Sequence, residues 1–387
     1  MNRREVKRAP VLRFKGFTND WEQRKLKEVV NINPSTNVPN TFNYVDLNSV
    51  KGVSLIKVKK INKKEAPSRA QRVAKNGDIF YQMVRPYQKN NYLFNKPKTS
   101  FPYVFSTGYA QLRSIKTSPS YIFPLLQKSD FVNKVLAHST GTSYPAINSR
   151  DLGQIKIYLP NELVEQNKIG EIFQKINKII ELQQRKLKLL KEIRKGIVEN
   201  IRDNNFEYKE QKNDFKDVKI KDMFKITRGK VLPKEKISSN KISPNIYPVF
   251  SSQTLNNGLL GFYKDYLFQN AITWTTDGAN AGTVNFRNEK FYSTNVNGVL
   301  LQKKIKPDLL TADLLNLVAF KYVSKVGNPK LMNNTMANIR IKIPSNTNAR
   351  IFYSKILNKC DTKIDFINKK IDYLTTFKRF LLQNMFI

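Results

Sequence analysis

The chain has 387 residues and a formal net charge of +38, from 68 Lys and Arg against 30 Asp and Glu. A charge of about 2 to 8 keeps a small domain soluble, so the excess favours a polyanionic partner, and nucleic acid over an acidic membrane surface. No apolar run approaches the roughly 18 residues of a membrane span, and the N-terminus leads into no signal-peptide core. The single cysteine, Cys360, excludes a disulfide framework and fits a reducing cytosol, so we expect a cytoplasmic protein.

The first half of the chain predicts a charged leader, a globular segment and one long helix. We expect residues 1–20 to be loosely held, and residues 21–160 to mix short β-rich runs with helical stretches such as 118–138. A strand that ends in proline then leads into a helix over 161–203, with Asn161 as its N-cap. The apolar residues of this helix recur at alternating steps of four and three, which is typical of a helix buried along one stripe.

The second half of the chain repeats this order. A polar linker over 204–214 precedes a second globular segment over 215–344, and a second striped helix covers 345–387. The second globular segment again mixes β-rich runs such as 271–275 with a helix over 311–323. Both globular segments are best described as α+β.

A strand, a proline and a long helix occur twice with matching residues. GQIKIYLP begins 184 positions before ANIRIKIP, and the helical stripes that follow keep this offset without a gap. Upstream the match is weaker: WEQRKLKEVVNI resembles FKDVKIKDMFKI at an offset of 194, and FSTGYAQL resembles YSTNVNGVL. We infer an internal repeat of one module. The residues predicted to form the core of the helix pair are Ile169, Phe173, Ile176, Ile180, Leu187, Leu190, Ile197, Ile201, Tyr353, Leu357, Cys360, Ile364, Ile367, Ile371, Leu374 and Leu381.

The length of the two helices predicts how they pair. Each would be roughly 60 Å long, and the only comparable apolar stripe that can cover one helix lies on the other. Because the linker spans at most about 40 Å, we expect an antiparallel coiled coil of spacer helices that separates two globular domains in a pseudo-two-fold arrangement. A cation occupies the same stripe position in both helices, as Arg194 and Lys378. Either its stem passes the seam and leaves the charge in water, or the polar group fixes the register of the pair.

Common catalytic motifs are missing from the sequence. There is no GxxxxGK[ST] phosphate loop, and DGANAG (277–282) lacks the spacing of a dinucleotide-binding loop. The single histidine, His138, excludes His-based triads and multi-His metal clusters. SFPY (100–103) lacks the amide and the first proline of an adenine-methyltransferase loop. We therefore expect no catalytic residues, no metal site and no cofactor bound by this chain.

Three segments carry a resemblance to a known family. PVLRFKGFTNDWEQRKLKEV (10–29), NGDIFYQMVRPY (76–87) and GTSYPAINSRDLGQIKIYLP (141–160) are similar, in this order, to segments of the specificity subunits of type I restriction-modification systems. Together with the duplication, the resemblance covers essentially the whole chain. It implies two target-recognition domains, 21–160 and 215–344, that each read one half of a bipartite, asymmetric site on double-stranded DNA.

The resemblance also implies partners. Two copies of a modification subunit would dock on the chain and methylate adenine with S-adenosylmethionine. Restriction and translocase subunits would add ATP- and Mg-dependent cleavage in host defence. From the residues alone, a stand-alone DNA-binding repressor or architectural protein with two domains remains the alternative.

Side-chain type predicts the DNA contacts. Arg can bind guanine with two hydrogen bonds, and Asn or Gln can bind adenine, whereas Lys, Ser and Tyr mostly hold phosphate. In the second domain TRGKVLPKEK and WTTDGANAG replace the Arg-Pro segment, so its base readout should differ. The residues predicted to bind DNA are Gln82, Arg85, Tyr87, Gln88, Lys89, Ser143, Tyr144 and Asn148 in the first domain, and Arg228, Lys230, Thr276, Asn280, Lys330, Asn333 and Asn334 in the second.

Overall fold

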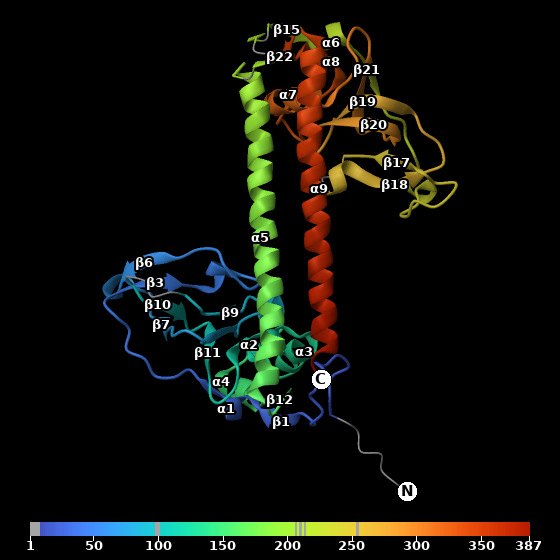
Figure 1. Ribbon diagram of the computed structural model, residues 1–387. Helices are drawn as coiled ribbons and strands as arrows, with labels where there is room; N and C mark the ends of the chain where they lie inside the picture. Colours follow the sequence, from blue (N-terminus) through green and yellow to red (C-terminus); the bar gives the residue numbers. More distant parts are fainter. Residues whose placement is uncertain (1–7, 97–100, 206, 209–210, 213, 253–254) are drawn as a thin grey trace. The chain divides into compact units, whose positions relative to one another are not determined.

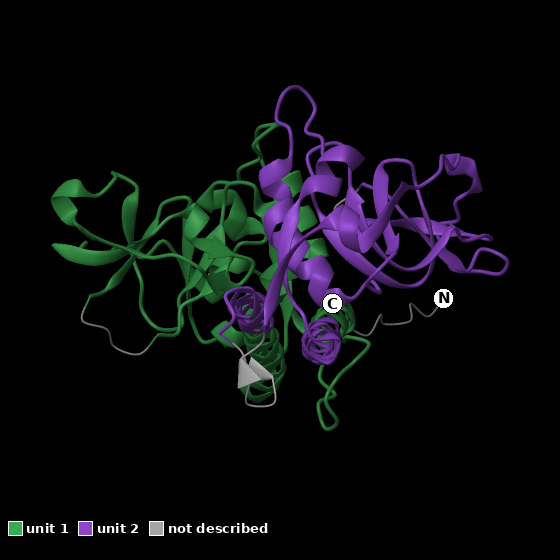
Figure 2. Cartoon of the chain, turned by 90° about the horizontal axis from the view of Figure 1, so that it is seen from above, with its two compact units in different colours: residues 1–186, 368–387 green, residues 187–367 purple. Residues whose placement is uncertain are grey.

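A computed structural model describes residues 8–96, 101–205, 207–208, 211–212, 214–252 and 255–387. The chain divides into two compact units, one of residues 1–186 with 368–387 and the other of residues 187–367 (Figure 2). The two long helices labelled in Figure 1 are α5 (Leu163–Arg202) and α9 (Thr347–Asn384). Each helix contributes one part to each unit. The predicted α+β class, with an internal repeat and two long helices, is confirmed.

The first unit is built on two four-stranded sheets and two antiparallel strand pairs. One sheet has the order β2-β11-β8-β9, the other has the order β6-β3-β10-β7, and β1 pairs with β12. The strands are β1 (Glu22–Lys25), β2 (Val30–Ile32), β3 (Thr41–Val45), β6 (Lys59–Asn62), β7 (Ala70–Val73), β8 (Ile79–Gln82), β9 (Tyr92–Leu93), β10 (Tyr103–Ser106), β11 (Tyr109–Ser114) and β12 (Lys156–Leu159), with a small β4 (Val50–Lys51) and β5 (Ser54–Leu55) pair. Strand β10 runs parallel to β3, which places residues about 60 positions apart side by side in the middle of this sheet.

Short helices cover the first unit, and one of them corrects the sequence prediction. The stretch 118–138 is two helices, α2 (Pro119–Gln127) and α3 (Ser129–Ala137), because Lys128 between them is extended with φ −62° and ψ 138°. The other helices are α1 (Leu26–Val29), α4 (Ser149–Gln154) and the 3-10 turns η1 (Leu47–Ser49), η2 (Lys63–Glu65) and η3 (Pro86–Gln88).

The second unit repeats this plan as a six-stranded sheet of order β16-β21-β19-β20-β17-β18 beside a β15–β22 pair. The long strand β20 pairs with both β19 and β17, whereas its counterpart in the first unit is divided into β9 and β10. The elements are β15 (Phe215–Lys219), α6 (Ile220–Met223), β16 (Phe224–Arg228), η4 (Lys234–Lys236), β17 (Tyr247–Phe250), η5 (Leu255–Gly258), β18 (Leu259–Tyr263), β19 (Phe268–Thr275), β20 (Val284–Ser293), β21 (Asn297–Gln302), α7 (Leu309–Ala319), η6 (Phe320–Tyr322), α8 (Asn333–Asn338) and β22 (Arg340–Pro344). The helix predicted over 311–323 is α7, which begins at Leu309 and ends at Ala319, and the 3-10 turn η6 follows it. Between α5 and β15, β13 (Glu207–Tyr208) pairs with β14 (Gln211–Lys212); residues 206, 209–210 and 213 of the predicted linker lie outside the described residues.

In each unit, apolar stripe residues of both long helices join the core of the globular body. Phe173 and Phe386 lie 5.6 Å apart between ring centres in the first unit, where Phe386 also packs on Tyr121 of α2. In the second unit Ile201 of α5 and Tyr353 of α9 share one buried cluster with Ile341 of β22. All sixteen residues predicted to form the helix-pair core are buried or half-buried, so the stripe marks the covered face of each helix.

The repeat extends to a contact that uses different side chains in the two units. In the first unit Gln166 donates from its amide to the Pro160 carbonyl and accepts from the Ser118 backbone N–H before α2. In the second, Arg350, 184 positions later, donates to the Pro344 carbonyl and lies 3.7 Å from Asp308, the N-cap of α7. Both residues are buried, so each ties the start of a long helix to its own globular body.

The leader is attached to the first unit wherever it is described. Arg13 makes two hydrogen bonds, of 2.7 and 2.9 Å, to the carboxylate of buried Glu165 in the first turn of α5, and the Leu12 N–H donates to the Asn384 carbonyl. The expectation of a loose leader is therefore wrong for residues 8–20, and residues 1–7 lie outside the described residues. Within the described part of the chain, no helix is both long and apolar enough to cross a membrane.

Candidate nucleic-acid interface

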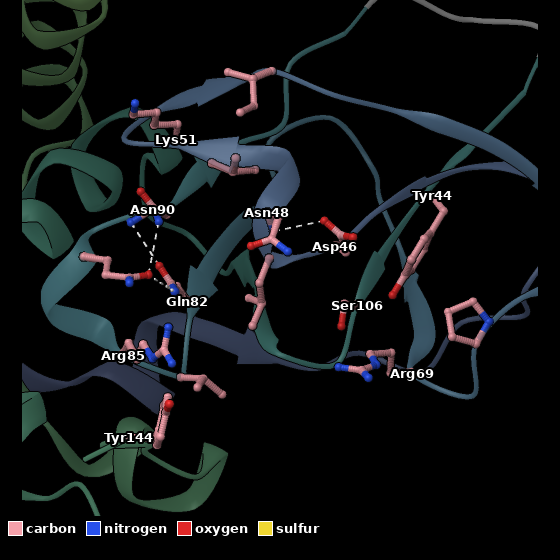
Figure 3. Close-up of a pocket in the computed structure, with 16 residues that line it drawn as sticks. Tyr44, Asp46, Asn48, Lys51, Arg69, Gln82, Arg85, Asn90, Ser106 and Tyr144 are labelled. Carbon is pink, nitrogen blue, oxygen red and sulfur yellow. Dashed lines mark hydrogen bonds between the residues drawn. The ribbon is translucent and has the colours of Figure 1, made fainter. Parts of the chain in front are cut away.

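The first unit has an open cavity of about 950 Å³ between the two sheets (Figure 3). Gln82, Arg85, Gln88 and Tyr144, four of the residues predicted to bind DNA, line it. Gln82 is the last residue of β8, Arg85 directly precedes η3, and Gln88 is the last residue of η3. Tyr144 lies in the loop before α4, more than 60 residues after Gln82. The lining mixes these polar side chains with apolar ones such as Leu47, Val50 and Ile56.

Arg85 is held by an unusual backbone conformation at the edge of the cavity. Its φ of +55° is left-handed, which is uncommon for a residue other than glycine. Its N–H donates to the Pro145 carbonyl, and its guanidinium lies 4.2 Å from the centre of the Tyr144 ring. The described residues offer the guanidinium no carboxylate partner, so its donors remain available to a ligand.

Gln82, at the end of β8, organises the wall of the cavity on the same side as Arg85 (Figure 3). Its amide N–H donates to the Gln88 side chain, its amide oxygen accepts from the Asn90 N–H, and its backbone N–H donates to Asn91 Oδ1. Although Gln82 is only 2% exposed, it lines the cavity. Two amide side chains, Gln88 and Asn90, thus stand at the rim with fixed orientations, as base-edge readout requires.

Sequence reasoning missed the other polar residues of the cavity. Exposed Lys51 and Arg69 make its rim positive, and Asp46 accepts hydrogen bonds from the Asn48 backbone and the Ser49 hydroxyl. Asp46 directly follows β3 and Arg69 directly precedes β7, and these two strands are brought together by β10, which pairs parallel to β3 and antiparallel to β7. The missed lining residues are Tyr44, Asp46, Asn48, Lys51, Arg69, Asn90 and Ser106 (Figure 3).

The remaining predicted contacts of the first domain, Tyr87, Lys89, Ser143 and Asn148, are not among the residues that line this cavity. Tyr87 and Ser143 are exposed. Lys89 donates to the Gln127 carbonyl and the Ser129 hydroxyl, and burial lowers the pKa of its ammonium. Asn148 caps α4 by accepting from the Asp151 N–H, so its carbonyl oxygen is already engaged.

The second unit has the same loop with a different residue at its key position. Gly278 donates its N–H to the Pro329 carbonyl, as Arg85 does to Pro145, and its φ of +93° is also left-handed. Isolated bridges match as well, Asp277 with Lys330 in the second unit and Val84 with Ala146 in the first. The two segments differ in sequence but form the same loop, which carries an arginine side chain in the first domain and a glycine in the second.

A smaller cavity of about 80 Å³ occupies the matching place in the second unit. Its walls include Thr275, the register equivalent of Gln82, and Arg287, which is only 7% exposed. The Arg287 guanidinium lies 3.6 Å from the Phe250 ring centre and donates to the Asn257 carbonyl, and burial lowers its pKa to about 10. Apart from Arg287, the described lining is neutral, with threonine and asparagine side chains prominent.

The predicted DNA contacts of the second domain differ in how exposed they are. Arg228, Lys230, Lys330 and Asn334 are exposed, and Asn280 and Asn333 are half-buried, with Asn280 lining the small cavity. Thr276 is different, because it is fully buried and its hydroxyl lies 2.9 Å from the Val296 carbonyl oxygen. Thr276 therefore holds the loop in place and does not face a ligand in this structure.

Comparison with known proteins supplies the family. The model of the type I restriction modification DNA specificity domain matches twice, over residues 18–192 and 212–376. A protein of Mycoplasma pneumoniae, named as the N-terminus of a type I specificity subunit, is 45% identical over 134 residues, which cover 34% of this chain and 70% of that one. The MpnII specificity subunit of the same organism is 40% identical over 134 residues, which cover 34% of this chain and 39% of that one.

A solved structure supports the same fold over the whole length. The S subunit of a type I restriction-modification system from M. genitalium superposes with a TM-score of 0.73, covering 98% of this chain and 99% of that chain at 14% identity. Since the family model matches both halves of the repeat, the chain belongs to the type I restriction-modification DNA specificity family.

Proposed function

We propose that the two domains each bind one half of a bipartite, asymmetric target on double-stranded DNA. The observation that carries this proposal is the shared loop that bears Arg85 in one domain and Gly278 in the other. The guanidinium of Arg85 can donate two hydrogen bonds to guanine in the major groove, whereas Gly278 has only backbone groups to offer. Two domains with one scaffold and unlike reading surfaces are suited to two unlike half-sites.

The long helices would act as spacers and as docking surfaces for two adenine-methyltransferase subunits. Besides the covered stripe, each helix carries a second, exposed apolar stripe. Leu189 and Ile193 of α5 are 49% and 55% exposed in the second unit, and Tyr373 and Phe377 of α9 are 69% and 39% exposed in the first. These pairs are again 184 positions apart, so each copy of the module offers a face at the same helical positions to one partner.

In this proposal the chain is not catalytic. S-adenosylmethionine would be used by the methyltransferase subunits, and ATP and Mg by restriction and translocase subunits where these are present. The net charge of +38 supports a role in holding DNA for those partners.

Co-purification with a methyltransferase subunit tests the proposal. We expect a complex with two partner copies, and adenine methylation that appears only in the mixture and maps to two unlike half-sites around a gap. Exchange of residues 1–160 for those of a relative should change only one half-site. A chain that binds DNA but no methyltransferase would instead support the stand-alone repressor or architectural protein, and a continuous palindromic target would contradict the bipartite arrangement.

A further inference from the structure

We propose that the two docking surfaces are unequal, and that the first methyltransferase subunit binds the α9 surface of the first unit before a second binds the α5 surface of the second unit. This inference rests on the proposed docking of two partner copies. It adds an order of assembly, a residue-level cause and the chemistry of the partner surface.

The α9 surface is an aromatic patch of Tyr373, Phe377 and Phe380, at steps of four and three along one face of the helix. Their exposed fractions are 69%, 39% and 48%. The rings of Tyr373 and Phe377 are stacked, with centres 6.3 Å apart and planes 1° from parallel. Three aromatic side chains thus form one apolar strip on a helix whose opposite face is already covered.

The α5 surface keeps the same spacing with smaller side chains. Leu189, Ile193 and Gly196 stand 184 positions before the three aromatic residues. A side chain at Gly196 would meet no atom of the described residues within 4 Å, so the third position is open and empty of side chain. An aromatic ring buries about 150 to 250 Å² in an interface, and Tyr is enriched among the residues that dominate binding, so the α5 surface should bind more weakly.

The charges beside the aromatic patch define the partner. Among the described residues, no ion pair engages the exposed Lys369, Lys370 or Arg379 beside the aromatic patch. On α5, Lys195, the counterpart of Arg379, lies 3.7 Å from Glu199, whereas no ion pair within the described residues engages Arg185 and Lys186, the counterparts of Lys369 and Lys370. The occupant that fits α9 is therefore an amphipathic helix of the methyltransferase subunit, with apolar residues at heptad spacing and acidic flanks.

Titration of the full chain with its methyltransferase subunit, followed by native mass spectrometry and calorimetry, tests the order. We expect a 1:1 complex to accumulate before the 1:2 complex, with dissociation constants at least about tenfold apart. Tyr373→Ala with Phe377→Ala should weaken the tighter step about tenfold or more, and Leu189→Ala with Ile193→Ala should weaken only the second. All four side chains are exposed, and an unchanged unfolding midpoint will show that the variants fold.

Other outcomes separate this inference from the proposed function. Two equal binding steps, or a larger effect of the α5 variant on the first step, would overturn the unequal surfaces and leave the docking of two partners intact. Dimerisation of the chain alone through the aromatic patch, lost in the Tyr373→Ala and Phe377→Ala variant, would replace the methyltransferase as occupant. Failure of the intact chain to bind any methyltransferase subunit would contradict both proposals.

Discussion

The Arg85 guanidinium stacks on the ring of Tyr144, 4.2 Å from its centre, across two loops of the first unit. Stacking orients the planar fork of donors while leaving its edge free, which is the geometry that bidentate guanine recognition needs. Because the Arg85 backbone is left-handed and bonded to Pro145, the side chain starts from a fixed point. We expect Arg85→Ala to weaken binding to the methylation-mapped target by about 1 to 3 kcal/mol.

Two further variants separate base readout from phosphate contact at this position. Arg85→Lys keeps the charge and loses the fork, so binding to the mapped target should fall while binding to random DNA is retained. Tyr144→Ala removes the stacking surface and should follow Arg85→Lys in direction. Fluorescence anisotropy at fixed salt measures both; an equal loss on random DNA would assign Arg85 to phosphate.

The matching glycine of the second domain allows the converse change. Gly278→Arg adds a side chain where the described residues leave open space within 4 Å, although the φ of +93° strains any residue with a Cβ by about 1 to 2 kcal/mol. We expect methylome sequencing to show an altered second half-site and an unchanged first. Gly278→Ala is the matched control, since it carries the strain without the guanidinium. A change in the first half-site would contradict the independence of the two domains.

The repeat and its helices were predictable from sequence because helical periodicity is local. Residues such as Phe173 and Tyr353 recur at steps that one helix satisfies by itself, so their burial follows without knowledge of the fold. The cavity was only partly predictable. Tyr44 and Arg69 line the same cavity as Arg85, and the pairing of β10 with both β3 and β7, which brings Tyr44 and Arg69 to one sheet, is encoded by no short pattern. Thr276 was misplaced because its polar, glycine-rich neighbours resemble an exposed loop, whereas backbone bonds to Val296 and Leu331 bury it.

Two glycines on α5 should respond in opposite ways to alanine. A Cβ at Gly170 would lie 2.3 Å from the Ser120 hydroxyl and 2.6 Å from its backbone carbon, so Gly170→Ala forces α2 away from α5. We expect a loss of about 1 to 3 kcal/mol in the free energy of unfolding, as for other overpacked sites. Gly196→Ala meets no described atom and should gain about 0.5 to 1 kcal/mol, because alanine loses less backbone entropy in a helix. Urea titration of both variants measures the difference, and a stabilising Gly170→Ala would show that the α2–α5 contact is loose.

Asp313 of α7 predicts a pH dependence in the second unit. Arg194 binds Asp313 and Asp361, each at 2.8 Å, yet burial dominates and raises the pKa of Asp313 to about 6. A carboxyl whose pKa is raised on folding holds a proton in the folded state that the unfolded chain has released. Its contribution to stability is therefore present at low pH and is lost as the pH rises from about 4 to 6.

The variant Asp313→Asn isolates this titration. Asparagine has no charge to bury, so the unfolding midpoint of the variant should rise relative to that of the unmodified protein between pH 4 and 7. Asp361→Asn is the comparison, because it removes the other carboxylate that Arg194 binds, at a more exposed position. A difference between the unmodified protein and Asp313→Asn that stays constant over this range would show that Asp313 does not titrate there.

Lys378 is the counterpart of Arg194 in the first unit. At the position that corresponds to the carboxylate partner of Arg194, the first unit has an amide side chain. Asp361, which binds Arg194, corresponds at the same offset of 184 to Asn177. Among the described residues, no hydrogen bond or ion pair of the Lys378 ammonium is found, and burial together with the nearby Lys89 lowers its pKa to about 8. A lysine whose pKa falls on folding opposes folding at pH 7, and this cost disappears as the pH rises from about 8 to above 10.

We expect Asn177→Asp to supply the missing carboxylate, to raise the pKa of Lys378 and to increase the unfolding midpoint at pH 7. Lys378→Met should also stabilise the protein at pH 7, because it removes a buried charge without a partner. The two effects should not add, since aspartate at position 177 has no cation to pair with once Lys378 is gone, and a double-mutant cycle at pH 7 measures this coupling. Additive effects would show that position 177 and Lys378 do not interact. The Arg194–Asp361 ion pair of the second unit would then have no corresponding contact in the first unit.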